Sequence, residues 1–453
     1  MRLRLLPLVL GLLLAAVPAA HGATWRQVTA PGGASIDQVG ALRTADGVLH
    51  VAWHRRTGPL TEDLLHTRIE PDGRVGATTP IVTGWTGVLD AALVAAPGGI
   101  RAFWGGQRST NTDDPNQELN TALSADGGAT WALQEGSIVP GGAQPHGSDV
   151  AATTLANGTT LQAWAGTLGT WVHAGLSPAT PNHDYMGAIG QYGYLPGIAS
   201  AGDAAVMAWY SSAAGRLGVL AQQVAPDGSP VGAPVTMPGS QALTAGGMTG
   251  RTPIVARVGG GFHVAYAIGN DVRWWRVGAP GAGRIARAQA PAATVAAAPD
   301  GRVWVAWSTG PFGRKRVFAR RSNRAATVFG AAVPAGAVRN ATTVYSLDAA
   351  ATAGALDILA LFGVGTTSGG STSVARVLPG LSLAASRSSL GRRPRQVVFR
   401  VLDAGDPVAG ATVRVSGRSA RTNQAGRVTF TLRGRARAVA TASGYTRAVK
   451  RLR

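Results

Sequence analysis

One short apolar segment recurs along most of the chain. Each copy is a run of four or five mostly apolar residues in which Ala precedes an aromatic residue. The copies are residues 49–53, 100–104, 161–164, 206–209, 262–266 and 303–307, with a weaker copy at 358–362. Short apolar runs bounded by turn residues are typical of buried strands. The copies recur about every 50 residues, close to the roughly 40–50 residues of a four-stranded propeller blade.

Turns and further short strands surround each copy in a constant order. Gly, Pro, Asn and Asp form the turns, as at 45–47 and 299–301, because these residues tolerate or preset the required backbone angles. A further apolar strand follows each copy, as at 64–69 and 217–224. No segment shows a convincing amphipathic helix pattern. The sequence therefore predicts an all-β fold, a β-propeller of seven blades, with six blades as the alternative.

The N-terminal segment resembles the end of an internal repeat. Residues 22–34 are similar to residues 128–143, which follow the third strand of the second repeat, whereas the seventh repeat ends after its third strand near 374–378. We therefore expect the N-terminal strand to complete the last blade, which would remove exposed sheet edges.

The first residues have the pattern of a secretory signal. Arg2 and Arg4 precede an apolar run at 5–16, and small residues follow at 20–22. No later stretch reaches the roughly 18 apolar residues that span a bilayer. We expect a signal peptide over 1–22 and a secreted, extracellular protein, and the sequence leaves open whether the protein stays at the cell surface.

Charge divides the chain near residue 380. The whole chain has a net charge of +20, and residues 381–453 contain 16 Lys and Arg but only Asp403 and Asp406. An Arg-rich surface attracts polyanions, so an anionic cell-envelope polymer is one expected partner; a merely solvated surface is the alternative. The chain contains no Cys, which excludes disulfides, thiol nucleophiles and Cys-zinc sites.

The C-terminal residues alternate in polarity like half-buried strands. Val413 and Val415 are one such pair, and Val428 and Phe430 are another. Residues 396–449 resemble the bacterial Ig-like and carboxypeptidase-regulatory-like domains, which implies a small β-sandwich without chemistry of its own. We expect the propeller over 23–380, a linker over 381–395 and the sandwich over 396–453.

The second repeat contains an eight-residue motif with the spacing Ser-x-Asp-x-Gly-x-Thr-Trp, formed by Ser124, Asp126, Gly128, Thr130 and Trp131. These are the defining positions of the Asp-box, and the motif resembles that of sialidase-like (BNR-repeat) propellers. In that family the box is a structural turn between the third and fourth strands. The resemblance therefore implies a sialidase-like propeller fold and says little about catalysis.

The sialidase resemblance also implies a catalytic set that the sequence does not match well. Retaining sialidases use an Arg cluster, a Tyr nucleophile activated by Glu, and an Asp acid/base. The family's Arg-Ile-Pro motif is absent from the start of the chain, and the nearest string, residues 251–254, lies in the fifth repeat. Glu occurs at only four positions, 62, 70, 118 and 135. We favour binding over catalysis, with an exo-alpha-sialidase-type glycoside hydrolase as the alternative.

Candidate ligand-binding residues are acids near the starts of the first strands, together with polar residues between repeats. The acids could face the central opening and bind a cation or sugar hydroxyls, or each could bond the backbone of a neighbouring blade, which we favour. The candidates are Asp37, Asp90, Asp149 and Asp348, with His146, His183 and Asp184 in predicted loops, and Arg251. No segment has metal-ligand spacing, and we expect no metal and no cofactor.

Taken together, the residues and the resemblance predict a secreted propeller protein that binds a glycan or another cell-envelope ligand. A structural or adhesive envelope protein is the second alternative. Specific binding to nucleic acid is not expected, and the oligomeric state is open.

Overall fold

The computed structural model describes residues 23–35, 38–59, 61–108, 118–134, 138, 148–166, 169–185, 193–241, 250–289, 291–338, 340–365 and 369–453. All regular elements within these ranges are β-strands, which agrees with the predicted all-β fold. No helix in the described ranges is long and apolar enough to cross a membrane. The expected signal peptide, residues 1–22, lies outside the described residues.

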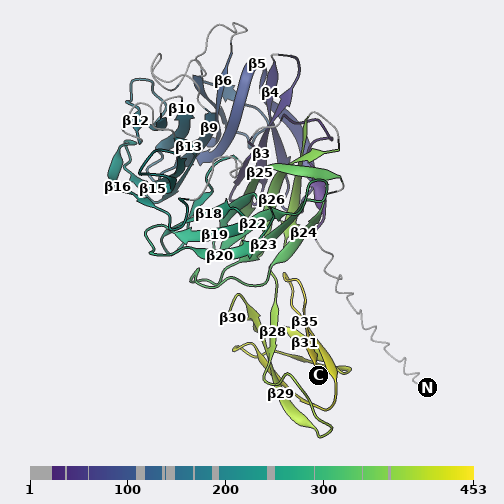
Figure 1. The fold of residues 1–453 in the computed structure, drawn as a ribbon. Coiled ribbons are helices and arrows are strands. Elements are labelled where there is room, and N and C mark those ends of the chain that lie inside the picture. The colour runs from purple at the N-terminus through teal and green to yellow at the C-terminus, as the bar shows by residue number, and fades with distance from the viewer. Residues whose placement is uncertain are drawn as a thin grey trace, which may run out of the picture.

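Residues 23–380, called the main body here, form five four-stranded sheets and one seven-stranded sheet (Figure 1). The seven-stranded sheet contains two four-stranded units that share β5, because β5 pairs with β4 through Val75 to Trp85 and with β6 through Thr86 to Ala96. Its strands are β2 (Gly40–Arg43), β3 (Leu49–Arg56), β4 (Glu62–Ile69), β5 (Val75–Ala96), β6 (Gly99–Gln107), β7 (Glu118–Ser124) and β8 (Ala132–Leu133).

The other sheets of the main body are antiparallel and mostly follow chain order. Two of them contain β9 (Ser148–Thr154), β10 (Thr160–Gly166), β11 (Gly169–Ala174) and β12 (His183–Asp184), then β13 (Gly193–Ala201), β14 (Ala204–Ser211), β15 (Gly218–Val224) and β16 (Pro230–Thr236). The next two contain β17 (Ile254–Ala256), β18 (Phe262–Ile268), β19 (Asp271–Arg276) and β20 (Gly283–Arg287), then β21 (Ala293–Ala297), β22 (Val303–Thr309), β23 (Arg316–Arg321) and β24 (Val333–Ala337).

The remaining sheet joins the two ends of the main body. It contains β25 (Ala341–Ala351), β26 (Leu356–Val364), β27 (Gly370–Val377) and the N-terminal strand β1 (Trp25–Gln27). Trp25 lies opposite Ala375, and its ring packs edge-on against Phe362 with centroids 5.0 Å apart. The prediction that the N-terminal segment pairs with the last repeat is confirmed.

The first strands of these sheets lie against one another. β2, β5, β9, β13, β17, β21 and β25 make contacts in chain order, and β25 also contacts β2. The aromatic residues of the repeated segment pack between neighbouring sheets: Trp104, Trp164, Trp209 and Trp304 are all less than 2 % exposed. Replacing one such Trp by Ala would cost about 3–5 kcal/mol of stability. The recurring pattern in the sequence is thus the pattern of the core.

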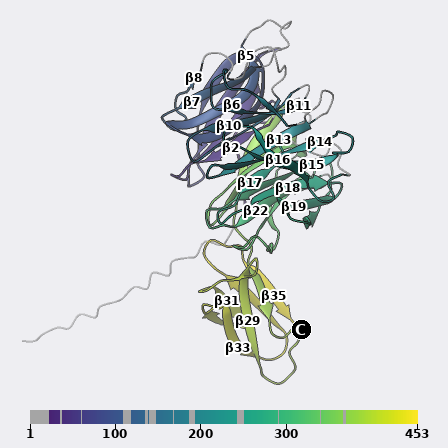
Figure 2. The ribbon, with the colours of Figure 1, turned by 90° about the vertical axis from the view of Figure 1, so that its left-hand side faces the viewer.

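Residues 381–453, called the C-terminal lobe here, form two more four-stranded sheets around one hydrophobic cluster. Figures 1 and 2 show this lobe at one end of the main body. One sheet contains β28 (Ser382–Ala385), β29 (Arg395–Asp403), β30 (Asp406–Pro407) and β33 (Arg427–Leu432). The other contains β31 (Thr412–Val415), β32 (Arg418–Arg421), β34 (Ala436–Thr441) and β35 (Ala448–Leu452).

Residues 381–395, which we expected to form a linker, are part of the folded C-terminal lobe instead. Its strand β28 pairs with β29, and Leu381, Leu383 and Leu390 are buried in the core of the C-terminal lobe. The Ser, Arg and Gly residues of the segment suggested a linker, but the three leucines provide enough apolar surface to anchor it.

Buried charges hold the C-terminal lobe to the main body. The Asp403 carboxylate contacts both Arg321 Nη2 and, at 3.4 Å, Arg302 Nη1, while Arg302 Nη2 lies 2.7 Å from the Asp406 carboxylate. The guanidinium of Arg321 also lies between the rings of Trp304 and Tyr445, 5.4 and 5.5 Å from their centroids. We call this group the interlobe clamp.

Candidate functional site

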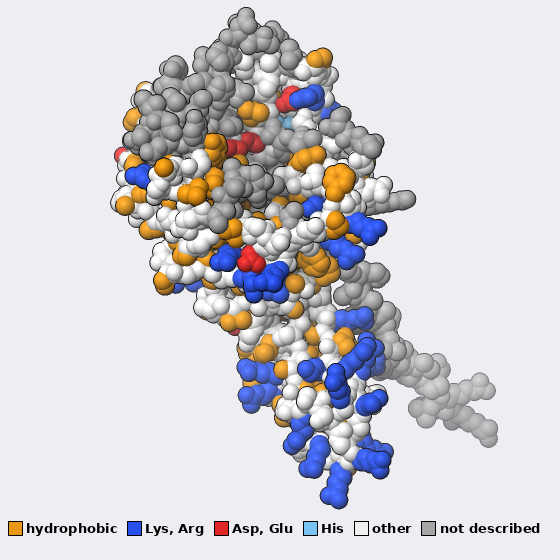
Figure 3. All heavy atoms as spheres, viewed as in Figure 1, with side chains coloured by type: hydrophobic (Ala, Val, Ile, Leu, Met, Phe, Trp, Pro, Cys, Tyr) orange, Lys and Arg blue, Asp and Glu red, His pale blue; other side chains and the backbone are white. Residues whose placement is uncertain are grey.

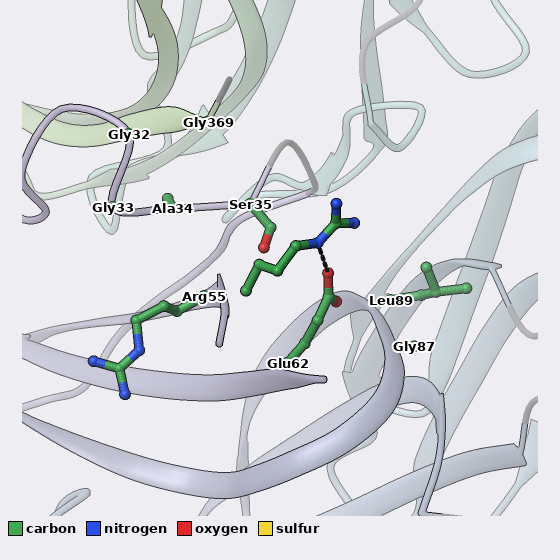
Figure 4. Close-up of a pocket in the computed structure, with 10 residues that line it drawn as sticks. Gly32, Gly33, Ala34, Ser35, Arg55, Glu62, Gly87, Leu89 and Gly369 are labelled. Atoms are coloured by element: carbon green, nitrogen blue, oxygen red, sulfur yellow. Dashed lines mark hydrogen bonds and ion pairs between the residues drawn. The ribbon is translucent and has the colours of Figure 1, made fainter. Parts of the chain in front are cut away.

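A pocket of about 770 Å³ lies among the described residues of the main body (Figure 4). Segments that are far apart in the sequence form its walls: the turn after β1, the β3–β4 hairpin, the middle of β5 and the residue before β27. Its lining residues are Gly32, Gly33, Ala34, Ser35, Arg55, Arg56, Glu62, Gly87, Leu89 and Gly369.

One wall of the pocket is backbone packed against backbone. A Cβ on Gly369 would lie 2.7 Å from the carbonyl oxygen of Gly32 and 2.9 Å from that of Ala34, so only glycine fits there. The amide of Ser35 donates a hydrogen bond to the His54 carbonyl at 2.9 Å, which fixes this wall against the β3–β4 hairpin. Backbone groups instead of large side chains therefore line this wall of the pocket.

The β3–β4 hairpin supplies the charges of the pocket. Arg56 lies opposite Glu62 in the strand register, and Arg55 lies opposite Asp63. Arg56 Nε is 3.3 Å from Glu62 Oε1, and Arg55 Nη2 is 2.6 Å from Asp63 Oδ2. Both acids are buried, whereas the side chains of Arg55 and Arg56 are 49 % and 70 % exposed. The pocket therefore presents guanidinium donors that two buried carboxylates hold in place.

The Ser35 hydroxyl is an unused polar group in this pocket. Its Oγ is buried and has no hydrogen-bond partner among the described residues. In Figure 4, Ser35 and Glu62 lie on facing walls of the hollow. A buried hydroxyl without a partner is unfavourable, so a ligand hydroxyl or carboxylate at this position would be stabilising.

Among the residues predicted from the sequence, Asp90 and Asp149 lie side by side on the first strands β5 and β9. Both have a positive φ, 31° and 56°. The Asp90 carboxylate accepts hydrogen bonds from the amides of Gln38 and Asp149, and Asp149 Oδ2 accepts one from the Leu195 amide at 3.1 Å. Each carboxylate thus joins its own strand to the next sheet. Burial and the neighbouring Asp90 raise the pKa of Asp149 to about 7.

Asp348 and Arg251 lie in the same central region. Asp348 Oδ2 accepts a hydrogen bond from the Ala41 amide at 3.0 Å, and burial raises the pKa of Asp348 against the opposing effect of Arg251. Arg251 Nη2 donates to the carbonyls of Val39 and Ala91 at 3.3 and 3.1 Å. Arg251 precedes β17, whereas Val39 precedes β2 and Ala91 is part of β5. Its side chain therefore spans the space between non-neighbouring sheets.

Four of the predicted residues, Asp90, Asp149, Asp348 and Arg251, thus lie in the central region, where their side chains form hydrogen bonds with backbone groups. Asp90, Asp149 and Asp348 bond the backbone of an adjacent sheet, which confirms the interpretation that we favoured. A ligand-binding role for them and for Arg251 stays a prediction. Asp37 lies outside the described residues.

The predicted loop residues are elsewhere. His183 and Asp184 form strand β12, the outermost strand of its sheet, instead of a loop. The next residue, Tyr185, donates its hydroxyl hydrogen to the Gly228 carbonyl at 2.9 Å, so this strand packs against the neighbouring sheet. His146 lies outside the described residues.

The Asp-box forms the turn between β7 and β8, as its resemblance implies. Asp126 accepts hydrogen bonds from the Ser124 hydroxyl at 2.8 Å, the Thr130 amide at 2.9 Å and the Thr130 hydroxyl at 2.6 Å. The Ser124 hydroxyl oxygen accepts a further bond from the Gly128 amide at 2.7 Å. The bonds from Thr130 lead those that hold the pKa of Asp126 below its ordinary value.

The box also anchors the second four-stranded unit of the seven-stranded sheet to the first unit. The Gly128 carbonyl accepts a hydrogen bond from the Thr79 hydroxyl at 2.8 Å and lies 3.1 Å from His66 Nδ1. The ring of Trp131 packs edge-on against His66, with centroids 5.3 Å apart. Its role here is structural.

No group of three or more His, Asp or Glu residues within the described ranges is placed to hold a metal ion.

The pocket itself was not predicted from the sequence. The adjacent Arg55–Arg56 and Glu62–Asp63 pairs were a usable signal, because a hairpin between them would place opposite charges across from each other.

No protein-family model matches the chain, and no curated protein matches it. Similar solved structures include an alpha-L-arabinanase of Penicillium chrysogenum complexed with arabinobiose, with 12% identity, a TM-score of 0.44, and coverage of 79% of this chain and 99% of that chain. A sialidase of Trypanosoma rangeli complexed with the inhibitor DANA has 10% identity, a TM-score of 0.41, and coverage of 78% of this chain and 59% of that one.

A third similar structure is YCF48 bound to a D1 peptide, with 12% identity, a TM-score of 0.44, and coverage of 80% of this chain and 97% of that chain. These resemblances are too distant to bear on function.

Proposed function

We propose that the main body is a seven-bladed, sialidase-like β-propeller and that the C-terminal lobe is an Ig-like β-sandwich, both in an exported protein. Seven four-stranded units support the blade count, together with first strands that contact one another in chain order and meet again at β25 and β2. Two sheets around one hydrophobic cluster support the sandwich. The sequence pattern of residues 1–22 supports export.

The proposed activity is binding of an acidic glycan at the Arg55–Arg56 pocket. The observation that carries it is the buried Ser35 hydroxyl, which has no partner among the described residues and lies across the pocket from the exposed Arg56 guanidinium. Guanidinium groups match carboxylates in geometry and charge, while backbone groups and hydroxyls match the polar edge of a sugar ring.

Binding fits the pocket better than glycoside hydrolysis. Most glycosidases place two carboxyl groups about 5–9.5 Å apart on either side of the scissile bond, and sialidases use Tyr in place of one. Among the described lining residues, Glu62 is the single acid, and it is paired with Arg56. Exo-alpha-sialidase-type hydrolysis is the alternative, and a structural or adhesive envelope role is the second alternative.

The C-terminal lobe has its own proposed partner, an anionic cell-envelope polymer. Its excess of Arg over two acids supports that partner. Attachment to the cell surface would then be electrostatic, because exposed basic residues attract polyanions over several ångströms at moderate salt.

A glycan array tests the pocket. The chain from residue 23 onward should bind carboxylated glycans in preference to neutral ones, and Ser35→Ala should weaken binding by about 3- to 10-fold, the usual effect of one hydrogen bond. The double variant Arg56→Gln/Glu62→Gln removes both charges without leaving either unpaired, and it should abolish the preference for carboxylates.

Arg216→Gln is the control, because Arg216 is an exposed arginine in the corresponding hairpin of another sheet, between β14 and β15. Equal loss in the control and the double variant would refute the pocket as the site. Turnover of a fluorogenic sialoside by the unaltered protein would favour the hydrolase.

A further inference from the structure

The interlobe clamp uses both acidic residues of the C-terminal lobe. Asp403 is 2 % exposed between Arg302 and Arg321, and Asp406 bonds the Arg302 side chain and the Arg324 amide. The clamp arginines belong to the main body. No acidic side chain of the lobe remains to neutralise its own basic residues.

The basic residues of the lobe are correspondingly unpaired. Every residue of the lobe is described, and none of its 16 Lys and Arg forms an ion pair with any described residue. Figure 3 shows Lys and Arg side chains spread over the face of the lobe that is in view. All are exposed except Lys450, which is half-buried.

Strand register concentrates three of these charges on the sheet that contains β31, β34 and β35. Arg437 lies directly opposite Arg451, and Arg414, which lies opposite Val439, is a diagonal neighbour of Arg437. Side chains that are directly opposite lie about 4.5–5.5 Å apart at Cβ, and diagonal neighbours lie about 7–8 Å apart. Like charges in such positions repel each other, so an anion between them would stabilise the lobe.

We propose that Arg414, Arg437 and Arg451, the Arg triad, bind the repeating carboxylate or sulfate groups of a flexible acidic polysaccharide. The proposal rests on the proposed function of the C-terminal lobe and assigns it a site. Exposed Val449, opposite Val439, supplies an apolar floor beside the triad on which the face of a sugar ring can pack.

The distribution of charge favours a flexible chain over a membrane. The other sheet has an opposed pair of its own, Arg400 and Arg427, so both sheets carry exposed arginines. A planar membrane can contact only one face of the lobe, whereas a flexible polymer can follow several.

The aromatic residues of the lobe favour a polysaccharide over single-stranded nucleic acid. Phe399 and Phe430 are buried in the core, and Tyr445 packs on the interlobe clamp. The lobe therefore exposes no aromatic platform on which bases could stack.

The test compares two triple variants of the chain from residue 23 onward. Arg414→Gln/Arg437→Gln/Arg451→Gln removes the triad. The control, Arg387→Gln/Arg395→Gln/Arg427→Gln, removes the same charge from exposed positions on the other sheet and its β28–β29 connection. Dissociation constants for polygalacturonate and dextran sulfate are measured at low and physiological salt, with neutral dextran, duplex DNA and anionic phospholipid vesicles as further ligands.

The unaltered protein should bind both acidic polysaccharides, more weakly at higher salt, and should not bind neutral dextran. The triad variant should lose at least about tenfold more affinity than the control, as expected for three clustered ion pairs. Dextran sulfate should also raise the melting temperature of the unaltered protein more than that of the triad variant, which separates binding from a folding defect.

Equal losses in the two triple variants would overturn the Arg triad while leaving polymer binding by the lobe intact. Failure of the unaltered protein to bind either acidic polysaccharide would overturn both. Tighter binding to DNA or to vesicles than to the polysaccharides would overturn the assigned class of partner.

Discussion

The main body and the C-terminal lobe use their acidic residues in opposite directions. In the main body, Asp90, Asp149 and Asp348 turn inward and accept hydrogen bonds from backbone amides of adjacent sheets. In the lobe, Asp403 and Asp406 turn outward to arginines of another part of the chain. Acids thus join sheet to sheet in one region and lobe to body in the other. In the lobe, the exposed charge that remains for partners is therefore basic.

The largest expected effect concerns the way in which the main body is closed. Deleting residues 23–34 removes β1, leaves the edge of β27 unpaired and removes one wall of the pocket. We expect a loss on the order of 5 kcal/mol and a melting temperature lower by at least 5 °C. Calorimetry should show the loss in the transition of the main body alone.

If the C-terminal lobe melted earlier to the same extent, the loss of β1 would have destabilised both regions, and they would not unfold independently. An unchanged melting temperature would mean that the pairing of β1 with β27 does not stabilise the main body.

The second prediction breaks the interlobe clamp. Asp403→Ala leaves the buried side chains of Arg302 and Arg321 without their shared carboxylate. Loss of one partner from a buried ion pair costs about 3–5 kcal/mol. Urea denaturation should show that loss, and limited proteolysis should cut between the lobes more readily. Asp406→Ala serves as the comparison. Because Asp406 is partly exposed, its replacement should cost less stability than that of Asp403, and an equal cost would contradict this order.

The third prediction concerns how the stability of the protein depends on pH through one inward-facing acid, Asp149. The pKa of Asp149 is raised from 3.8 to about 7 in the folded protein. Folded Asp149 therefore keeps its proton where the unfolded chain has released it, and its contribution to the free energy of unfolding falls as the pH rises from about 4 to 7. Asp149→Asn, which can still accept the Leu195 hydrogen bond, should gain stability relative to the unaltered protein over that range.

Urea melts at pH 5 and pH 8 measure this difference. The buried histidines His50, His66 and His263, whose pKa values burial lowers to about 4, change stability in the opposite direction and are the same in both proteins. A difference between variant and unaltered protein that is constant with pH would rule out the raised pKa.

The smallest effect concerns the Arg triad in the absence of ligand. Arg451→Glu converts the opposed pair with Arg437 into an attractive pair, which should stabilise the lobe by about 0.2–1 kcal/mol. The same change should weaken binding to dextran sulfate. A destabilised lobe at low salt would show that Arg437 and Arg451 do not repel each other in the free protein.

The local sequence pattern was enough to predict the strands. The sites could not be predicted in this way, because they depend on contacts between residues that are far apart in the sequence. The Ala–aromatic segments become buried strands because Trp104, Trp164 and their equivalents fill the space between sheets. The pairing of β1 was predictable because its sequence resembles an internal fourth strand. The pocket was not, because Ser35, Arg56 and Gly369 meet only after the ends of the main body join.

The role of the two acids in the lobe also escaped sequence reasoning. Asp403 and Asp406 looked like a minority charge on a basic domain, and nothing in their local pattern points to Arg302 or Arg321, about 80 to 100 residues earlier in the chain. Contacts between separately folded regions leave no periodicity in the sequence.

The pairing of β1 with β27 also imposes a waiting time on synthesis. Trp25 is made early but pairs with Ala375, about 350 residues later. At roughly 5–20 residues per second, a ribosome needs about 20 to 70 seconds to cover that distance. Throughout this interval the first strand has no partner and the main body cannot be completed. A chain built in this order stays open, and accessible to chaperones or a transport machinery, until almost all of its first 380 residues exist.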